Sequence, residues 1–97
     1  MTDVDDLTVH WEEDGEVRVH ERDKCIIQRG SWATILYRYD ERDRKTGEMH
    51  GPKFAIRRYR KRGDAYQVHS KLVLTSAEQA RAVAEQLLQW TDPSTNA

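Results

Sequence analysis

The stretch of sequence that decides the fold is residues 53–90, KFAIRRYRKRGDAYQVHSKLVLTSAEQARAVAEQLLQW. Residues 53–62 and 66–74 are two runs rich in strand-forming residues, and the turn pair Gly63-Asp64 lies between them. From Thr75 onward the spacing of apolar residues changes from two to about 3.6, the period of an α-helix. Strands followed by one helix predict an α+β fold in which the helix covers one face of the sheet.

The start of the helix is marked by capping residues. Ser76 and Gln79 match a capping box, and Thr75 with Glu78 is a second option. We therefore expect a helix over residues 76–90. Its apolar stripe consists of Ala77, Ala80, Val83, Ala84, Leu87 and Leu88.

The apolar stripe is the face that should pack on the sheet. We expect Ala80, Ala84 and Leu87 to be turned inward. The helix should end near Trp90, because Thr91-Asp92-Pro93 cannot continue it, and residues 91–97 are expected to form a disordered tail.

Upstream of residue 53 the pattern predicts further strands. Alternating apolar residues flank Asp14-Gly15, a favoured hairpin turn pair. The other predicted segments are a short apolar run at residues 25–27, a strand over 32–39 and a polar loop over 40–52. We expect a curved antiparallel sheet of four to five strands within a single domain over residues 7–90, preceded by a disordered arm at residues 1–6.

The composition favours one small domain with a thin core. The 97 residues are 37% hydrophobic and 34% charged, which is enough for one sheet and one helix. Cys25 is the single cysteine and excludes an intramolecular disulfide, so a partner subunit is the expected source of extra stability. A single cysteine suits a reducing cytoplasm. The acidic start of the chain predicts no signal peptide, and no apolar run approaches the length of a membrane span.

The net charge of −1 conceals a strong asymmetry along the chain. Residues 1–23 carry a net charge of −7, residues 24–62 carry +8 and residues 63–97 carry −2. The positive charge is therefore concentrated in the middle of the chain, where a local field can favour an anionic partner. The alternative is a solvated strand face that the acidic N-terminal part balances.

The basic charge is densest in residues 53–62, which hold six bases and no acid. The even positions Phe54 and Ile56 are expected to face the core. The opposite face then presents bases and one aromatic ring: Lys53, Arg57, Tyr59 and Lys61. Cations that follow phosphates beside aromatic rings that stack on bases are typical of single-stranded nucleic-acid binding. Plain edge protection by lysine and arginine is the other explanation.

Residues from the neighbouring strands extend the predicted basic face. In residues 66–74 one parity is apolar and the other includes Lys71. In residues 32–39 both parities hold apolar residues, so the pattern alone cannot orient this strand. If Ala33, Ile35 and Tyr37 face the core, Trp32 and Arg38 join the basic face; a core or dimer contact is the other role for Trp32.

Motifs of catalysis and metal binding are missing from the sequence. The four histidines have no metal-ligand spacing, and Cys25 has no CxxC partner. No glycine-rich phosphate loop and no nucleophile elbow occurs. We therefore expect no enzyme activity, no cofactor, no metal and no small-molecule substrate.

Three short motifs carry a resemblance to a known family. Residues 53–59 (KFAIRRY) and residues 71–75 (KLVLT), which lead directly into the helix, resemble the C-terminal domain of the transcriptional coactivator positive cofactor four. The small bacterial members of that family are the most similar, and residues 30–32 (GSW) are similar to the start of one of their strands. The resemblance covers residues 19–90.

The resemblance implies a curved four-stranded sheet with a helix, dimerisation through the helices, and single-stranded DNA lying across the sheets. The matching site positions are Trp32, Lys53, Arg57 and Tyr59. Two phosphate contacts of the family are lost or moved, because Thr34 stands where a lysine is expected and Ser70-Lys71 replaces a Lys-Gly pair. The hairpin around Asp14-Gly15 is an addition whose acids could compete for the basic face.

The sequence thus predicts a coactivator-like domain that binds single-stranded DNA or RNA and forms a homodimer through Leu88 or Trp90. The rival interpretation is a protein-interaction module whose basic face meets an acidic partner. The discriminating feature is whether Trp32, Arg57, Tyr59 and Lys61 form one exposed concave surface; a scattered set favours the rival.

Overall fold

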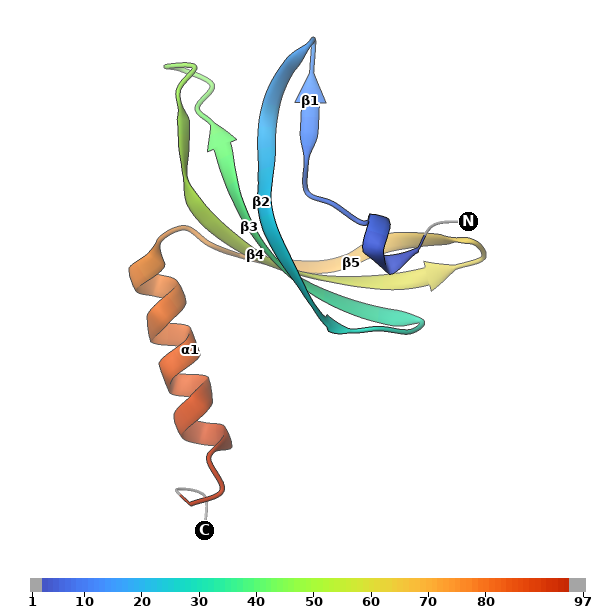
Figure 1. The fold of residues 1–97 in the computed structure, drawn as a ribbon, viewed down its shortest axis with the longest axis vertical. Helices are drawn as coiled ribbons and strands as arrows, with labels where there is room; N and C mark the ends of the chain where they lie inside the picture. Colours follow the sequence, from blue (N-terminus) through green and yellow to red (C-terminus); the bar gives the residue numbers. More distant parts are fainter. Residues whose placement is uncertain (1–2, 95–97) are drawn as a thin grey trace.

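The structure is a computed structural model that describes residues 3–94, and in it a five-stranded antiparallel sheet is followed by one helix (Figure 1). The strands lie in chain order: β1 (Trp11–Glu13), β2 (Glu16–Gln28), β3 (Trp32–Arg42), β4 (Met49–Arg62) and β5 (Ala65–Leu74). A 3-10 helix, η1 (Val4–Asp6), precedes the sheet, and α1 (Ala77–Thr91) follows it. The predicted α+β class, with a curved antiparallel sheet and a C-terminal helix, is confirmed.

The turns explain where the strands begin and end. Asp14 and Gly15 both have positive φ, +53° and +80°, as a type I′ hairpin turn requires. The loop between β3 and β4 is shorter than the predicted loop over residues 40–52. The carboxylate of Asp43 accepts the N–H groups of Lys45 and Thr46 at 2.7 and 3.0 Å. This contact closes the turn within residues 43–48, so β3 and β4 both extend into the predicted loop.

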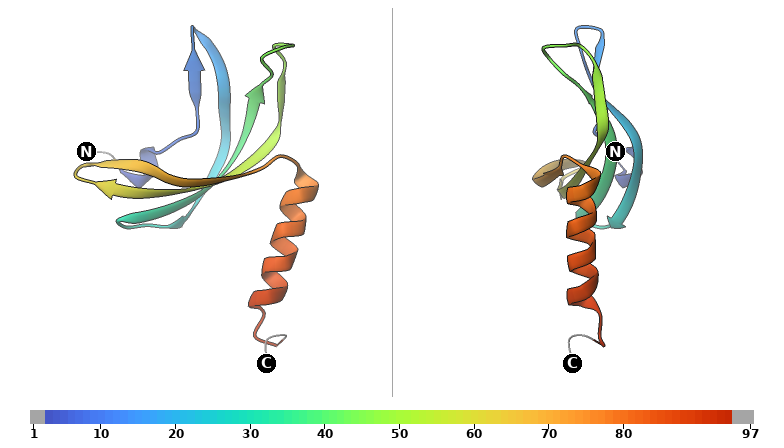
Figure 2. Two further views of the ribbon diagram at one scale, coloured as in Figure 1. Left: turned by 180° about the vertical axis from the view of Figure 1, so that it is seen from behind. Right: turned by 90° about the vertical axis from the view of Figure 1, so that its left-hand side faces the viewer.

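Extra residues in the strands bend the sheet into a half-barrel. The register shifts by one residue at Arg22 and Ile27 in β2 and at His69 in β5. Such bulges increase local twist and curvature. The result is a concave face that holds the N-terminal segment and a convex face from which α1 departs (Figures 1 and 2).

The core lies on the concave face. Ala33, Ile35 and Tyr37 are fully buried there, and Val4 and Val9 of the N-terminal segment close over them. Residues 3–6 are therefore ordered, in contrast to the expected disordered arm, because an apolar side chain anchors η1. Residues 1–2 lie outside the described part of the chain.

The predicted orientation of β4 is inverted. Its odd positions Ala55 and Tyr59 are each 3% exposed and lie in the concave core, whereas Phe54 and Ile56 are half-buried on the convex face. The N-terminal segment covers the odd face of β4, and this long-range contact leaves no mark on the alternation within the strand.

Helix α1 begins as predicted but does not cover the sheet. The hydroxyl of Ser76 accepts the N–H of Gln79 at 3.1 Å, while the side chain of Gln79 accepts the N–H of Thr75. Only Thr75 and Ser76 separate β5 from α1, so the helix continues away from the end of the strand (Figure 2). No helix residue is buried, and Leu87, expected to face inward, is 50% exposed.

Ala80 and Ala84 were also expected to face inward. Ala80 is half-buried, but Ala84 is exposed. The expected tail is partly ordered, because Thr91 belongs to α1 and the N–H of Ser94 donates to Asp92 at 2.9 Å. Residues 95–97 lie outside the described part of the chain.

Candidate nucleic-acid interface

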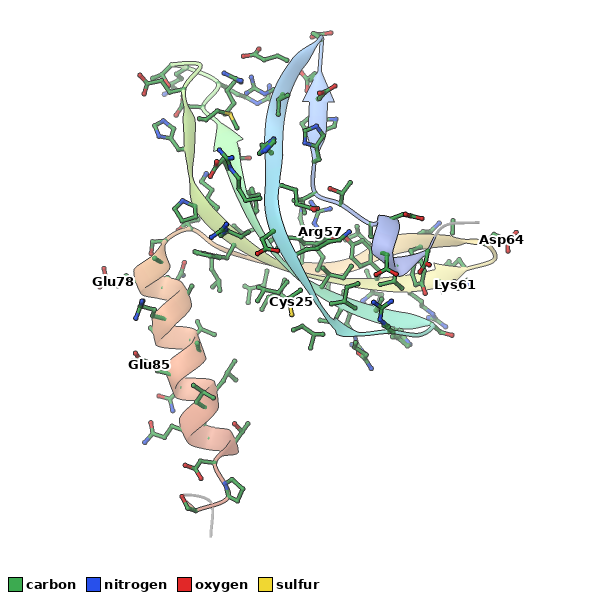
Figure 3. All side chains as sticks on the ribbon, viewed as in Figure 1. Cys25, Arg57, Lys61, Asp64, Glu78 and Glu85 are labelled. Atoms are coloured by element: carbon green, nitrogen blue, oxygen red, sulfur yellow. The ribbon has the colours of Figure 1, made fainter. Side chains whose placement is uncertain are left out.

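The β4–β5 hairpin carries a group of cations without acidic partners. Ion pairs elsewhere hold Arg22 to Asp40 at 2.6 Å and Lys53 to Glu41 at 2.7 Å. Six cations of the hairpin take part in no ion pair within residues 3–94, and we call them the hairpin cations: Arg57, Arg58, Arg60, Lys61, Arg62 and Lys71. Asp64, at the hairpin turn, is the one acid between residues 57 and 71 (Figure 3). Their positive field is therefore not neutralised locally.

Three of the residues on the convex side of the hairpin surround Trp32. The guanidinium carbons of Arg58 and Arg60 lie 4.4 and 5.1 Å from the centre of the half-buried Trp32 ring. The ring of His69 meets the same indole edge to face, with centroids 4.7 Å apart. Cation–π contacts of this kind hold guanidinium groups over an aromatic face while leaving their outer N–H groups open to an anion.

The bulge in β5 explains why His69 belongs to this cluster. In the ladder Arg58 is opposite Ser70, and the next residue, Tyr59, is opposite Val68. His69 is thus the extra residue, and the parity of β5 changes at that point. The predicted apolar face of β5 is consequently divided between the two faces of the sheet.

The concave side of the hairpin holds three of the hairpin cations: Arg57, Lys61 and Lys71. Arg57 points into the concave side (Figure 3) and is directly opposite Lys71 in the ladder. Its Nε atom is buried and has no hydrogen-bond partner within residues 3–94. Lys61 lies 5.9 Å from the centre of the Tyr66 ring, and the hydroxyl of Tyr66 donates to the carbonyl of Gly30 at 2.8 Å.

Tyr59, expected to stack on bases, is a core residue. It is 3% exposed, and its hydroxyl shares a 2.7 Å hydrogen bond with the hydroxyl of Tyr37. Burial, together with this hydrogen bond, raises the pKa of Tyr37 above its usual value. The prediction of an exposed Tyr59 is wrong, because its ring fills the concave core.

Two further predicted residues lie away from the hairpin cations. Lys53 is near the other end of the concave face and is held by Glu41. Arg38 is exposed on the convex side of β3, opposite Phe54 in one ladder and Asp23 in the other.

The predicted site is therefore divided between two faces. Trp32 and Arg38 lie on the convex face, and the concave face holds Lys53, Arg57, Tyr59, Lys61 and Lys71. Trp32, Arg57, Tyr59 and Lys61 do not form one exposed concave surface.

The sequence interpretation missed Arg58, Arg60 and His69. The two arginines share a parity with Phe54 and Ile56, which we expected to face the core. A useful signal was the abrupt change from apolar to basic residues along that parity, since a continuous core stripe would not end in three arginines.

The convex face also has an apolar part, beside the helix. A groove of about 530 Å³ lies between α1 and the sheet. Its walls are formed by Leu36, Phe54, Ile56, Leu74, Ala77, Ala80, Arg81, Val83, Ala84 and Leu87. Leu88 and Trp90, the residues expected at a dimer interface, are 70% and 64% exposed near the end of the helix.

Two other features, a cluster of metal ligands and a membrane-spanning helix, are absent from residues 3–94. Within residues 3–94 no group of three or more His, Cys, Asp or Glu side chains is arranged to hold a metal ion. No helix among the described residues has the length and apolar character needed to span a membrane. Comparisons with protein-family models, curated proteins and solved structures give no match for this chain.

Proposed function

We propose that this protein binds single-stranded nucleic acid through the β4–β5 hairpin and Trp32. The observation that carries the proposal is the group of hairpin cations, which have no ion pair with an acid within residues 3–94 and of which Arg58 and Arg60 lie over the half-buried indole ring of Trp32. Cations that contact phosphates next to an aromatic plane on which a base can stack are the components of single-strand recognition.

Edge protection accounts poorly for the hairpin cations. Five of the six lie on β4, and β4 is paired with β3 on one side and β5 on the other. An inner strand has no free edge to protect. A binding role remains the better explanation of so many unpaired cations on an inner strand.

The resemblance to the coactivator family supports the proposal. The family's curved antiparallel sheet and C-terminal helix agree with the fold of this chain. We extend the proposal to a transcription-coactivator-like role. Trp32 and Arg57 match site positions of the family, and Arg58, Arg60 and His69 on the convex face are added to them.

The first prediction concerns salt dependence. Binding of fluorescent oligo-dT, followed by anisotropy, should weaken with salt with a slope of about −3 in log affinity against log salt, if about four phosphates are neutralised. Replacing Arg58 and Arg60 with glutamine should reduce the steepness by about 0.7 for each lost contact. The matched control replaces Arg44 and Lys45, exposed in the loop at the other end of the sheet, and should keep the slope. No binding by the folded protein at low salt would reject the proposal.

An acidic protein partner is the second candidate. It is favoured by the division of Trp32 and Tyr59 between two faces, which leaves few rings exposed for stacking. Replacement of Trp32 distinguishes the two candidate functions. If the protein binds single strands, Trp32→Leu should weaken oligo-dT binding by about 1–3 kcal/mol with little change in the slope of log affinity against log salt. Equal binding of polyglutamate and oligo-dT, with no effect of Trp32→Leu, would favour the protein partner.

We also infer that the protein is a homodimer. Apart from Arg81, the groove beside α1 is lined by apolar residues, and the same chain carries an apolar helix end with Leu87, Leu88 and Trp90 exposed. An amphipathic helix gains most of its stability by packing its apolar face, and here this face is open. In a two-fold arrangement each copy supplies both the groove and the helix end that fills it.

For the cellular compartment we propose the cytoplasm. Cys25 is a free and exposed thiol, and no second cysteine exists with which it could pair within the chain. Thiols of this kind are typical of a reducing compartment.

A further inference from the structure

The N-terminal segment, residues 3–10, crosses the concave face without joining the sheet. Backbone pairing with β2 begins only at Trp11, which is opposite Val19. The segment is instead held by the side chains of Val4 and Val9, which are 4% and 6% exposed in the core. Figure 1 shows η1 inside the bend of the sheet, near the β4–β5 hairpin.

The contacts of this segment with Arg29 and Lys24 are of the kind that a bound anionic strand would make. Arg29 donates to both carboxylate oxygens of Asp5, at 3.0 and 3.3 Å. The ammonium group of Lys24 donates to the backbone carbonyls of Asp5 and Leu7 at 2.6 and 2.7 Å. A carboxylate thus occupies the position at Arg29 in which a phosphate would be held in the same bidentate manner.

The charge of the segment matches this role. Residues 3–10 contain three acids, Asp3, Asp5 and Asp6, and no lysine or arginine. The hydrogen bond with Arg29 lowers the pKa of Asp5 and so further favours its charged form.

The surface beneath the segment continues the path of the hairpin cations. Val9 lines one side of a pocket of about 150 Å³, and Arg57 and Lys71 line the same pocket. Tyr39 forms part of its wall, and Tyr37 lies in the core cluster with Val9. Displacement of the segment would therefore add aromatic rings, Lys24 and Arg29 to a surface that already has cations. It would also free the carboxylate of Glu21, which accepts the hydroxyl of Thr8 at 2.6 Å.

We infer that residues 3–10 are an intramolecular inhibitor that occupies the concave part of the nucleic-acid path and leaves it when a strand binds. The inference rests on the proposed function. Displacement would break no ladder hydrogen bonds, and the ion pair of the segment is solvent-exposed, with Arg29 and Asp5 side chains 60% and 56% accessible. Its cost is mainly the exposure of Val4 and Val9, which the binding of a strand would have to offset. Exposed ion pairs are weak and are screened by salt.

The test compares two substitutions that change the charge equally. Asp5→Asn should raise the affinity for oligo-dT at low salt by about twofold to fivefold, the value of an exposed ion pair that no longer competes. Glu12→Gln is the matched control: Glu12 is similarly exposed, at 59%, but lies on β1, and its carboxylate is near the imidazole of His10 rather than a cation of the sheet. It should raise affinity less than Asp5→Asn does.

A second measurement follows the segment itself. The methyl resonances of Val4 and Val9, which pack among tyrosine rings, should move toward random-coil positions when oligo-dT saturates the protein. Wild-type protein that binds oligo-dT with both methyl signals unmoved, and with Asp5→Asn equal to Glu12→Gln, would overturn the inference alone. Loss of binding in every variant would overturn the proposed function and the inference together.

Discussion

At the scale of single residues, a hydrogen bond between the hydroxyl groups of Tyr37 and Tyr59 lies at the centre of the concave core. The two oxygens are 2.7 Å apart, and both rings are almost completely buried. A buried hydroxyl that loses its partner costs about 1–3 kcal/mol, whereas loss of both hydroxyls leaves neither unsatisfied. The two groups are therefore expected to behave as a unit.

Tyr59→Phe should lower the free energy of unfolding by about 1–3 kcal/mol, because the hydroxyl of Tyr37 is left buried without an acceptor or donor. Urea unfolding measures the change. The double replacement of Tyr37 and Tyr59 with phenylalanine should restore much of the loss. Tyr66→Phe is the control and should cost less, since the hydroxyl of Tyr66 bonds to an exposed carbonyl. Equal losses for Tyr59→Phe and Tyr66→Phe would contradict this account.

Single residues also set the limit of prediction from sequence. The alternation within β3 correctly places Ala33, Ile35 and Tyr37 together on one face of the strand. It does not show which residues of β4 lie on that same face of the sheet. The ladder places Ala55 opposite Tyr37 and therefore buries the odd face of β4. The bulge at His69 has no sequence signature of its own, so the place of His69 in the convex cluster at Trp32 was not predictable from the pattern.

At the scale of elements, helix α1 is determined locally at its start and by distant partners along its length. The cap at Ser76 depends on residues within four positions, and it was predicted correctly. Burial of the apolar stripe depends on what packs against it, and the two-residue connection to β5 directs the helix away from its own sheet. The sequence contains the stripe but not the identity of the surface that covers it.

Ser76→Ala should lower the free energy of unfolding by about 1 kcal/mol, because the N–H of Gln79 loses its acceptor. Circular dichroism during urea unfolding provides the measurement. Ser31→Ala replaces an exposed serine in the turn before β3 and should leave stability unchanged within about 0.5 kcal/mol. If Ser76→Ala is as neutral as Ser31→Ala, the cap does not stabilise the helix.

At the scale of the whole molecule, the charge asymmetry of the chain becomes an arrangement in space. The acidic first part supplies the segment on the concave face, and the basic middle part supplies β4 and the hairpin cations. Opposite charges thus meet where Asp5 of η1 contacts Arg29 in the β2–β3 turn, while the β4–β5 hairpin keeps its positive charge. Composition alone indicates the imbalance, but only the fold brings the first residues next to the β2–β3 turn.

The open groove beside α1 gives the last prediction, which concerns oligomeric state. Light scattering at micromolar concentration should give a mass of about twice 11.4 kDa for the wild type. Leu88→Asp should reduce the mass to the monomer value, because a charge at the apolar helix end cannot be buried in the groove of a second copy without a large desolvation cost. Leu88 is 70% exposed in the single chain, so the change should have little effect on the folding of the sheet.

Ala82→Asp is the matched control for this experiment. Ala82 is exposed and lies by helical spacing between Glu78 and Glu85 on the polar side of α1, so a charge there should leave the dimer intact. A wild-type mass near 11.4 kDa would exclude the dimer, and loss of the dimer in both variants would show that the interface is not the apolar face of α1. If the dimer forms through this face, the midpoint of unfolding should rise with protein concentration, because association stabilises the folded state by mass action.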